Sequence, residues 1–158
     1  MRELTAKDIM TYDVLQAKAD WSLSRLAEFL VENSISGAPV ISEDGKLVGV
    51  VSVTDILCHD IVPEKNSQPY GAHEFYLHTI ERQFAKQEIE SMHFENEPQT
   101  TTSDIMTTTI FNVGEETRAQ EVADTMIRSH IHRVFVTREN KVVGIISAVD
   151  MLEIIRDL

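Results

Sequence analysis

The chain has 158 residues and a formal net charge of −12, so it has little to attract nucleic-acid phosphates or anionic lipids. We therefore expect no nucleic-acid partner and no membrane partner. The longest apolar run, Leu47 to Val53, is too short to span a bilayer, and the amino terminus has no signal-peptide pattern. The single cysteine, Cys58, excludes an intrachain disulfide. These features predict a cytoplasmic protein.

The chain contains an internal repeat. Asp8-Ile-Met-Thr11 recurs as Asp104-Ile-Met-Thr107, and the run from Gly49 to Leu57 recurs as that from Gly144 to Leu152. The spacing between the copies changes by one residue at a hairpin turn, where such a change is tolerated. The sequence therefore predicts one duplicated structural unit.

The first copy predicts a capped helical turn, a short strand, an amphipathic helix, a β-hairpin and a final helix. The apolar residues of the amphipathic helix recur at i, i+3, i+4 and i+7, which indicates one buried face. The expected elements are Thr5–Asp8, Val14–Gln16, a helix of about ten residues bearing Leu23, Leu26, Ala27 and Leu30, the strands Ala38–Ile41 and Leu47–Val53, and a helix that begins at Asp55.

The second copy predicts the same order, so the fold class is α+β. The second strand of each hairpin is nearly continuous apolar sequence, which predicts burial on both faces. One copy has too little core to stand alone, so we expect the copies to pack face to face. The expected elements are Thr101–Asp104, Ile110–Val113, a helix capped near Thr117 and bearing Val122, Ala123, Met126 and Ile127, the strands Val134–Thr137 and Val142–Ser147, and a helix from Asp150.

An acidic segment between the copies belongs to neither. We assign residues 1–60 to repeat 1, 61–100 to this insert and 101–158 to repeat 2. The insert has loop-like composition at first and helical composition from His73 to about Met92. It predicts either a helix that covers one edge of the core or a partner surface formed by Phe75, Tyr76, Phe84 and Phe94.

The duplicated motifs resemble a tandem pair of cystathionine-β-synthase (CBS) domains, the Bateman module. The resemblance rests on Asp8-Ile-Met-Thr11, Ile35-Ser-Gly-Ala-Pro-Val40, Gly49-Val-Val-Ser-Val-Thr-Asp-Ile-Leu57 and their second-copy counterparts. It implies a stand-alone pair of βαββα repeats related by pseudo-two-fold symmetry. It also implies clefts for adenosine-containing ligands such as AMP, ADP, ATP or S-adenosylmethionine, and a disc-like homodimer.

The residues at the strand–helix junctions suit such a ligand. An ionised Asp55 or Asp150 offers two acceptor oxygens to the two neighbouring hydroxyls of a ribose. The amino terminus of the following helix offers N–H groups to a phosphate, and Ser52, Thr54 and Ser147 add hydroxyls. Both Asp residues would also serve as helix N-caps, a role that alone accounts for their positions.

The two junctions are not equivalent. Thr54 of the first corresponds to Val149 of the second, which cannot donate a side-chain hydrogen bond. His132 and Arg133 replace a Ser-Gly pair, so only the second copy has a basic residue ahead of its hairpin. We expect one good site or one composite site, with Ser52, Thr54 and Asp55 on ribose and phosphate and with charge from Arg133.

These observations predict a regulatory module that senses cellular energy or a metabolite by binding an adenine nucleotide or S-adenosylmethionine. We expect no required cofactor and no enzymatic activity, because no catalytic set is apparent. The alternative is a protein-interaction module with vestigial pockets, in which the acidic insert binds a protein target. The histidine spacings predict no metal site, and Cys58 is expected to pack as a small apolar residue. Gly49 and Gly144 lie inside strands, where we expect them to permit close backbone approach by a neighbouring part of the chain or by a ligand.

Overall fold

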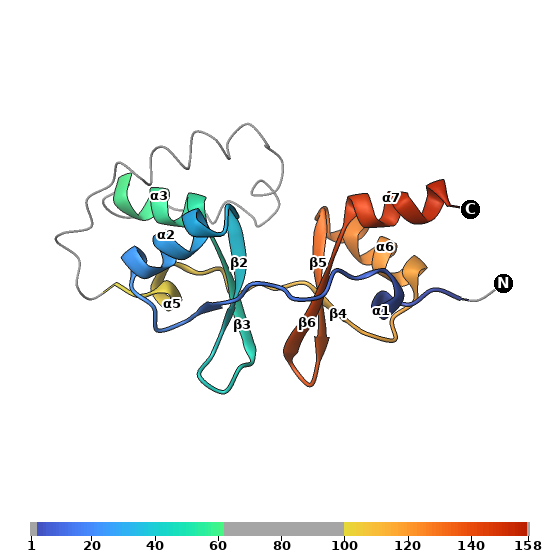
Figure 1. Ribbon diagram of the computed structural model, residues 1–158, viewed down its shortest axis with the longest axis horizontal. Helices are drawn as coiled ribbons and strands as arrows, with labels where there is room; N and C mark the ends of the chain where they lie inside the picture. The colour runs from blue at the N-terminus through green and yellow to red at the C-terminus, as the bar shows by residue number, and fades with distance from the viewer. Residues whose placement is uncertain (1–2, 62–99, 158) are drawn as a thin grey trace. The chain divides into compact units, whose positions relative to one another are not determined.

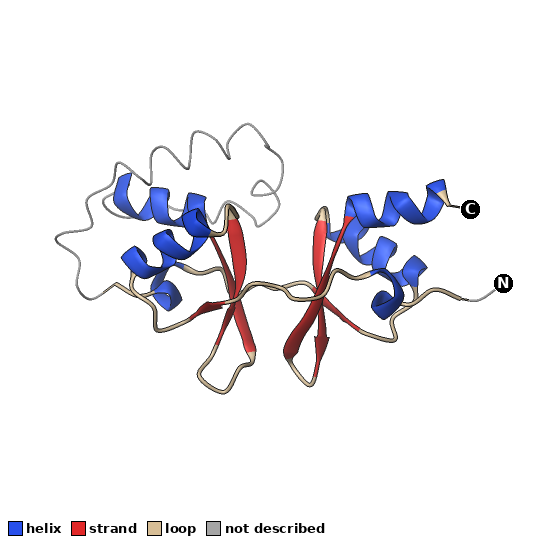
Figure 2. Ribbon diagram, in the orientation of Figure 1, coloured by secondary structure: helices blue, strands red, loops and turns tan. Residues whose placement is uncertain are grey.

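The computed structural model describes residues 3–61 and 100–157 (Figure 1). They fall into two compact units, each with a three-stranded sheet and helices (Figure 2), which confirms the α+β class. We call Leu15–Ile110 the Ser52 unit, and Met1–Val14 with Phe111–Leu158 the Ser147 unit. The predictions for the insert fall almost entirely outside the described residues, and face-to-face packing of the copies stays a prediction.

The Ser52 unit has the sheet order β1-β2-β3, with β1 parallel and β3 antiparallel to β2. Its first strand begins three residues later than the sequence analysis predicted. Its elements are β1 Ala17–Lys18, α2 Leu23–Glu32, β2 Gly37–Ile41, β3 Leu47–Ser52, α3 Val53–Ile61 and α5 Thr102–Ile105.

The Ser147 unit repeats this arrangement with the order β4-β5-β6. Its elements are α1 Ala6–Ile9, β4 Asn112–Gly114, α6 Ala119–Ser129, β5 Arg133–Arg138, β6 Lys141–Ser147 and α7 Ala148–Arg156.

The leading turn of each repeat belongs to the unit built by the other repeat. Thr11, just after α1, pairs with Ile145 of β6 through N–H···O bonds of 2.8 and 3.0 Å. Thr107, just after α5, pairs with Val50 of β3 in the same way at 2.8 and 2.9 Å. The compact units therefore divide the chain differently from its repeats.

Gly49 and Gly144, inside their strands, each leave room for the side chain of a methionine. A Cβ on Gly49 would lie 2.9 Å from Cγ of Met106, and a Cβ on Gly144 would lie 2.7 Å from Cγ of Met10. Real Cβ atoms do not tolerate such distances, so these positions require the close approach that glycine permits. The expectation of close approach at both glycines is confirmed.

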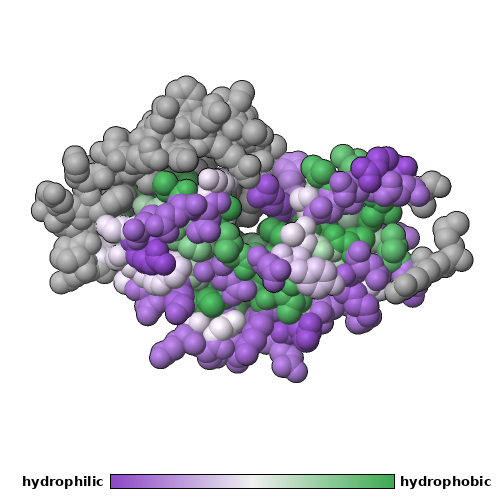
Figure 3. Space-filling view, viewed as in Figure 1, coloured by the Kyte–Doolittle hydropathy of each residue, from purple (hydrophilic) through white to green (hydrophobic). Residues whose placement is uncertain are grey.

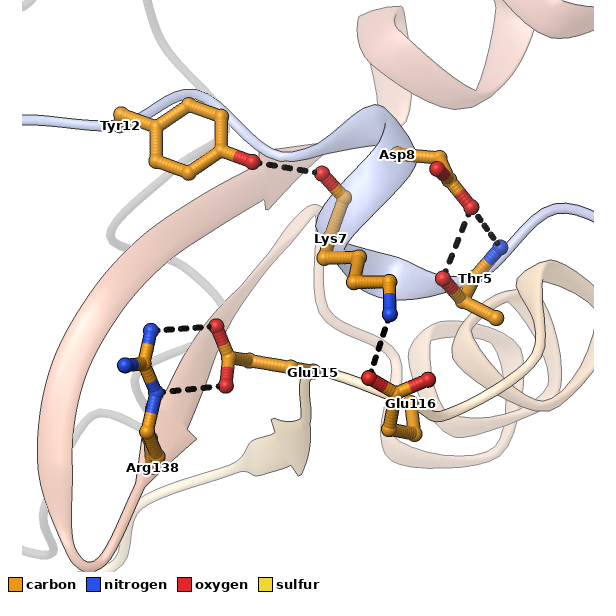
Figure 4. A network of polar contacts seen from close by, with 7 residues as sticks. All are labelled: Thr5, Lys7, Asp8, Tyr12, Glu115, Glu116 and Arg138. Atoms are coloured by element: carbon orange, nitrogen blue, oxygen red, sulfur yellow. Dashed lines mark hydrogen bonds and ion pairs between the residues drawn. The ribbon is translucent and has the colours of Figure 1, made fainter.

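A polar network joins α1 to the rest of the Ser147 unit (Figure 4). Arg138 forms two hydrogen bonds of 2.7 Å with Glu115, and Nζ of Lys7 lies 2.5 Å from Oε1 of Glu116. The hydroxyl of Tyr12 donates to the carbonyl oxygen of Lys7 at 2.9 Å. The hydrogen bond from Arg138 lowers the pKa of Glu115, and the bond to Glu116 raises the pKa of Lys7.

Each unit has its own apolar core. The predicted face of α2 is buried as expected, including Leu26 at 0% exposure. Val122 and Met126 of α6 are buried, but Ile127 is 70% exposed, so its place on the buried face was wrong. Consecutive helical residues differ by about 100°, which turns Ile127 away from Met126.

The prediction of strands buried on both faces holds for only one hairpin. From Gly49 to Ser52 every residue of β3 is buried. In β6, buried residues alternate with exposed or half-buried ones, so only one of its faces is fully covered.

Candidate functional site

The first candidate site lies where β3 passes into α3. Ser52 ends the strand, and α3 begins at Val53, so Asp55 is the third helical residue. The prediction that the helix begins at Asp55 was wrong by two residues. Ser52 provides the cap instead, because its Oγ accepts a hydrogen bond from the Asp55 amide at 3.0 Å.

Ser52 and Asp55 form a tightly bonded pair. Ser52 is only 1% exposed, and its Oγ donates to Oδ2 of Asp55 at 2.7 Å. Burial raises the pKa of the Asp55 carboxyl from 3.8 to about 6, against the opposing effect of the hydrogen bonds from Ser52. The carboxyl is therefore mainly ionised at neutral pH and gains a proton in mildly acidic solution.

The second candidate site lies where β6 passes into α7 and has the same hydrogen bonds. Oδ2 of Asp150 accepts from the Ser147 amide at 2.7 Å and from Ser147 Oγ at 2.8 Å. Ser147 is the N-cap and accepts from the Asp150 amide at 3.2 Å. Both residues are half-buried, so this site is shallower around its serine than the first.

The start of the preceding strand lies beside each junction. In the Ser147 unit, Arg133 pairs in register with Ser147, and the Ala148 amide donates to the His132 carbonyl at 2.8 Å. His132 is exposed and Arg133 is half-buried. In the Ser52 unit the corresponding positions are Ser36 and Gly37, which provide no charge.

The structure therefore groups the predicted site residues by unit. Ser52, Thr54 and Asp55 lie together in one unit, with the Thr54 side chain exposed. The remaining predicted residues lie in the Ser147 unit and are His132, Arg133, Ser147 and Asp150. A composite site that adds Arg133 to the first group stays a prediction.

The helix amino termini offer fewer N–H groups than the sequence suggested. In α3, the Val53 amide donates to the carbonyl of Ser36 at 2.9 Å, and the Asp55 amide donates to Ser52. Two of the first three amides of α3 thus already have acceptors before a ligand arrives. This leaves Thr54 as the first-turn residue whose amide and hydroxyl suit a phosphate.

Other candidate features give no site among the described residues. Cys58 is exposed, so the expectation that it packs in the core was wrong. Residues 3–61 and 100–157 contain no cluster of three His, Cys, Asp or Glu side chains that could hold a metal ion. No helix in this part of the chain is long and apolar enough to cross a membrane.

A family model for the CBS domain matches this chain twice, at residues 6–60 and 103–157. The chain belongs to the CBS-domain family. An uncharacterized protein of Methanocaldococcus jannaschii is 26% identical to this CBS pair over 97% of the chain and 89% of that protein. The match to the chloroplastic CBS domain-containing protein CBSX1 of Arabidopsis thaliana, 30% identical over 85% of the chain, covers 56% of that protein.

Solved structures share the fold of this CBS pair. CBSX2 in complex with AMP superposes with a TM-score of 0.65 at 22% identity, covering 97% of this chain and 96% of that one. The CBS domain pair of protein MJ0100, in complex with 5′-methylthioadenosine and S-adenosyl-L-methionine, superposes with a TM-score of 0.63 at 22% identity. That match covers 99% of this chain and 98% of the other.

Proposed function

We propose that this CBS pair is a regulatory module that binds an adenosine-containing ligand, with Ser52, Thr54 and Asp55 as the principal site. The hydrogen-bonded pair of buried Ser52 and half-buried Asp55 carries the proposal. The hydrogen bond between Ser52 and Asp55 fixes the position of one carboxylate oxygen in the first turn of α3. The adenosyl ligands of the two similar structures support the same ligand class.

The proposed contacts follow from the acceptors and donors present. Asp55 accepts from the ribose hydroxyls, and Thr54 donates to a phosphate or to another polar group of the ligand. In the other unit, Arg133 pairs in register with Ser147 and supplies positive charge there, which matters for an anionic ligand in a chain of net charge −12. Ser147, Asp150 and His132 form a second and weaker site in the other unit.

Titration with AMP, ATP and S-adenosylmethionine tests this proposal, after absorbance near 260 nm has shown whether the purified protein retains a nucleotide. We expect at least one ligand to bind and Asp55→Ala to weaken it at least tenfold. The matched control is Asp104→Ala, because Asp104 accepts a hydrogen bond from the Thr101 amide in the same unit, at 2.8 Å. Absence of binding, or equal losses in both variants, would refute the proposal.

The alternative function, protein interaction, is favoured by one described surface. Val149, Leu152 and Ile155 of α7 are 64%, 61% and 65% exposed. They follow each other at i, i+3 and i+6 and form an apolar stripe on one side of the helix, the α7 stripe. Figure 3 shows hydrophobic side chains at the surface in the region of α7.

The fold does not require the α7 stripe. In the first repeat the corresponding residues are Thr54, Leu57 and Asp60, so two of the three are polar. Glu153 and Arg156 are also exposed on α7. Oε1 of Glu153 lies 3.9 Å from Nη1 of Arg156, so the two charges balance each other. We propose that a second copy of this chain covers the stripe in a homodimer. A two-fold axis at Leu152 would bring Val149 of each copy against Ile155 of the other, and these two residues are similar in shape and apolar character.

A cysteine cross-link tests the homodimer. Leu152 would lie on the two-fold axis, so Leu152→Cys in a Cys58→Ser background should give disulfide-linked dimers. Leu15→Cys, at another exposed apolar residue, is the control. Sedimentation of the wild type should show a concentration-dependent dimer that Leu152→Glu dissociates. A wild type that stays monomeric would refute the homodimer.

A further inference from the structure

The hydrogen bonds around Asp55 fix which of its oxygens a ligand can use. Ser52 Oγ accepts from the Asp55 amide at 3.0 Å, so its single proton points to Oδ2, 2.7 Å away. The Ser52 amide also bonds the carboxylate. Among the described residues, no other group donates to Asp55. Oδ2 is therefore held by Ser52 Oγ, and Oδ1 is the oxygen that this hydroxyl leaves for a ligand or for an acquired proton.

Among residues 3–61 and 100–157, no charged group holds Asp55 ionised. Three elements pack against α3, namely α2, β3 and α5, and β3 has no titratable side chain. All the titratable groups of the two helices are exposed, as is His59 on α3 itself, and none of them contributes to the shift in the pKa of Asp55. These groups are Arg25, Glu28 and Glu32 of α2 and Asp104 of α5.

A ribose needs the ionised carboxyl. Its two neighbouring hydroxyls both donate, and an ionised Asp55 accepts from them in charge-assisted hydrogen bonds. A protonated Oδ1 would instead present an O–H to these donors, and the charge-assisted bonds would be lost. Burial, which raises the pKa of Asp55 to about 6, places this change of state within a physiological range.

We propose that binding of a nucleoside ligand at the Ser52–Asp55 site is coupled to loss of one proton from Asp55, so that this half of the CBS pair responds jointly to ligand and pH. In the coupled step the carboxylic O–H bond breaks, the proton passes to solvent, and the carboxylate accepts from the ligand hydroxyls. The inference rests on the proposed function.

Calorimetric titration with adenosine and 5′-methylthioadenosine between about pH 5 and about pH 8 tests the coupling, because neither ligand titrates in that range. AMP is unsuitable for this experiment, since its phosphate itself gains a proton near pH 6. We expect affinity to fall by about tenfold per pH unit well below pH 6 and to be constant well above it. At about pH 5, titrations in two buffers of different ionisation enthalpy should show release of close to one proton per ligand.

Two variants identify the group that titrates. Asp55→Asn keeps the shape and the bond from Ser52 but has no proton to lose, so its binding should be weaker and independent of pH. Asp104→Asn, the matched change at an aspartate of the same unit outside the site, should leave the pH dependence intact.

The possible failures are distinguishable. Absence of binding by these nucleosides and by AMP, ATP and S-adenosylmethionine at every pH would overturn the proposed function itself. Binding without proton release, or a pH dependence that persists in Asp55→Asn, would overturn only the coupling. Binding of AMP but of neither nucleoside would also overturn the coupling, because phosphate contacts rather than ribose contacts would then drive binding.

Discussion

The Ser52 and Ser147 junctions share their hydrogen bonds and differ in depth. In both, a serine ends the strand, caps the helix and bonds the aspartate three residues later. Ser52 is 1% exposed, whereas Ser147 is half-buried. The comparison shows that duplication has kept the bonds that start the helix, while the surroundings that set the chemistry of the carboxyl have changed.

The same contrast continues along the two helices. Ile56 of α3 is 0% exposed, but its counterpart in α7, Met151, is half-buried. The α7 stripe faces solvent, while Leu57 in α3 packs partly against the core. The helix next to the principal ligand site is therefore held more firmly than its duplicate.

The largest expected effect comes from truncating these two helix residues. Ile56→Ala should lower the free energy of unfolding by about 3–4 kcal/mol, because it leaves a cavity in a closed core. Met151→Ala should cost about 1–2 kcal/mol, since solvent already reaches that side chain. Urea unfolding measures both, and equal losses would contradict the difference in depth.

A smaller effect is expected at the strand glycines. Gly144→Ala should destabilise by about 2 kcal/mol, because the new methyl group would collide with Met10. Gly49→Ala should cost less, because its new methyl group would meet only the sulfur and Cγ of Met106 within 3.0 Å, whereas that of Gly144→Ala would also lie 2.9 Å from Cβ of Met10. Thermal unfolding measures both, and Met10→Ala should partly rescue Gly144→Ala. A double variant no more stable than Gly144→Ala would place the cause elsewhere.

The ionisation of Asp55 should oppose stability. Its pKa is about 6 in the folded protein against an ordinary value of 3.8, so the folded state binds more protons between these values. Stability from this group is therefore lost as pH rises from about 4 to about 6. Asp55→Asn should lack this loss, so its free energy of unfolding should exceed that of the wild type by about 1–2 kcal/mol at pH values above about 7.

Denaturant unfolding at several pH values measures this effect. The full shift in the pKa of Asp55 would correspond to about 3 kcal/mol of unfolding free energy, and the partial exposure of Asp55 reduces this value. A variant with the same pH profile as the wild type would show that Asp55 has an ordinary pKa.

The smallest expected effect concerns the ion pairs of the Ser147 unit. Lys7 and Glu116 are exposed, so Lys7→Ala should lower thermal stability only slightly, and less still in high salt. The corresponding position in α5 of the Ser52 unit is Ser103, which has no charge to lose. A large loss that is independent of salt would mean that Lys7 acts through packing.

The sequence predicted the features that depend on local pattern. The helical spacing of Leu26 and its neighbours located α2. The strand patterns located the hairpins, and the capping patterns located the leading turns. The strand glycines indicated close approach, although not that Met10 and Met106 provide it. The sequence analysis placed the N-caps at Asp55 and Asp150, which was wrong, because Ser52 and Ser147 cap the helices and both helices begin two residues earlier than predicted.

The missed features depend on long-range contacts. Nothing local assigns α1 to the unit of the other repeat, because its capping bonds form either way and the pairing of Thr11 with Ile145 decides. Hydrophobic character alone does not separate a core residue from an interface residue, so Ile127 and the α7 stripe were not recognised as exposed. The burial of the Asp55 carboxyl, which raises its pKa, has no signal in the sequence.

The inequality of the two junctions is tested most directly by the stoichiometry of ligand binding. Calorimetric titration of the full chain with 5′-methylthioadenosine at neutral pH should show a single tight site that Asp55→Ala removes and Asp150→Ala leaves in place. Two equal and independent sites, each removed by its own aspartate variant, would contradict the account.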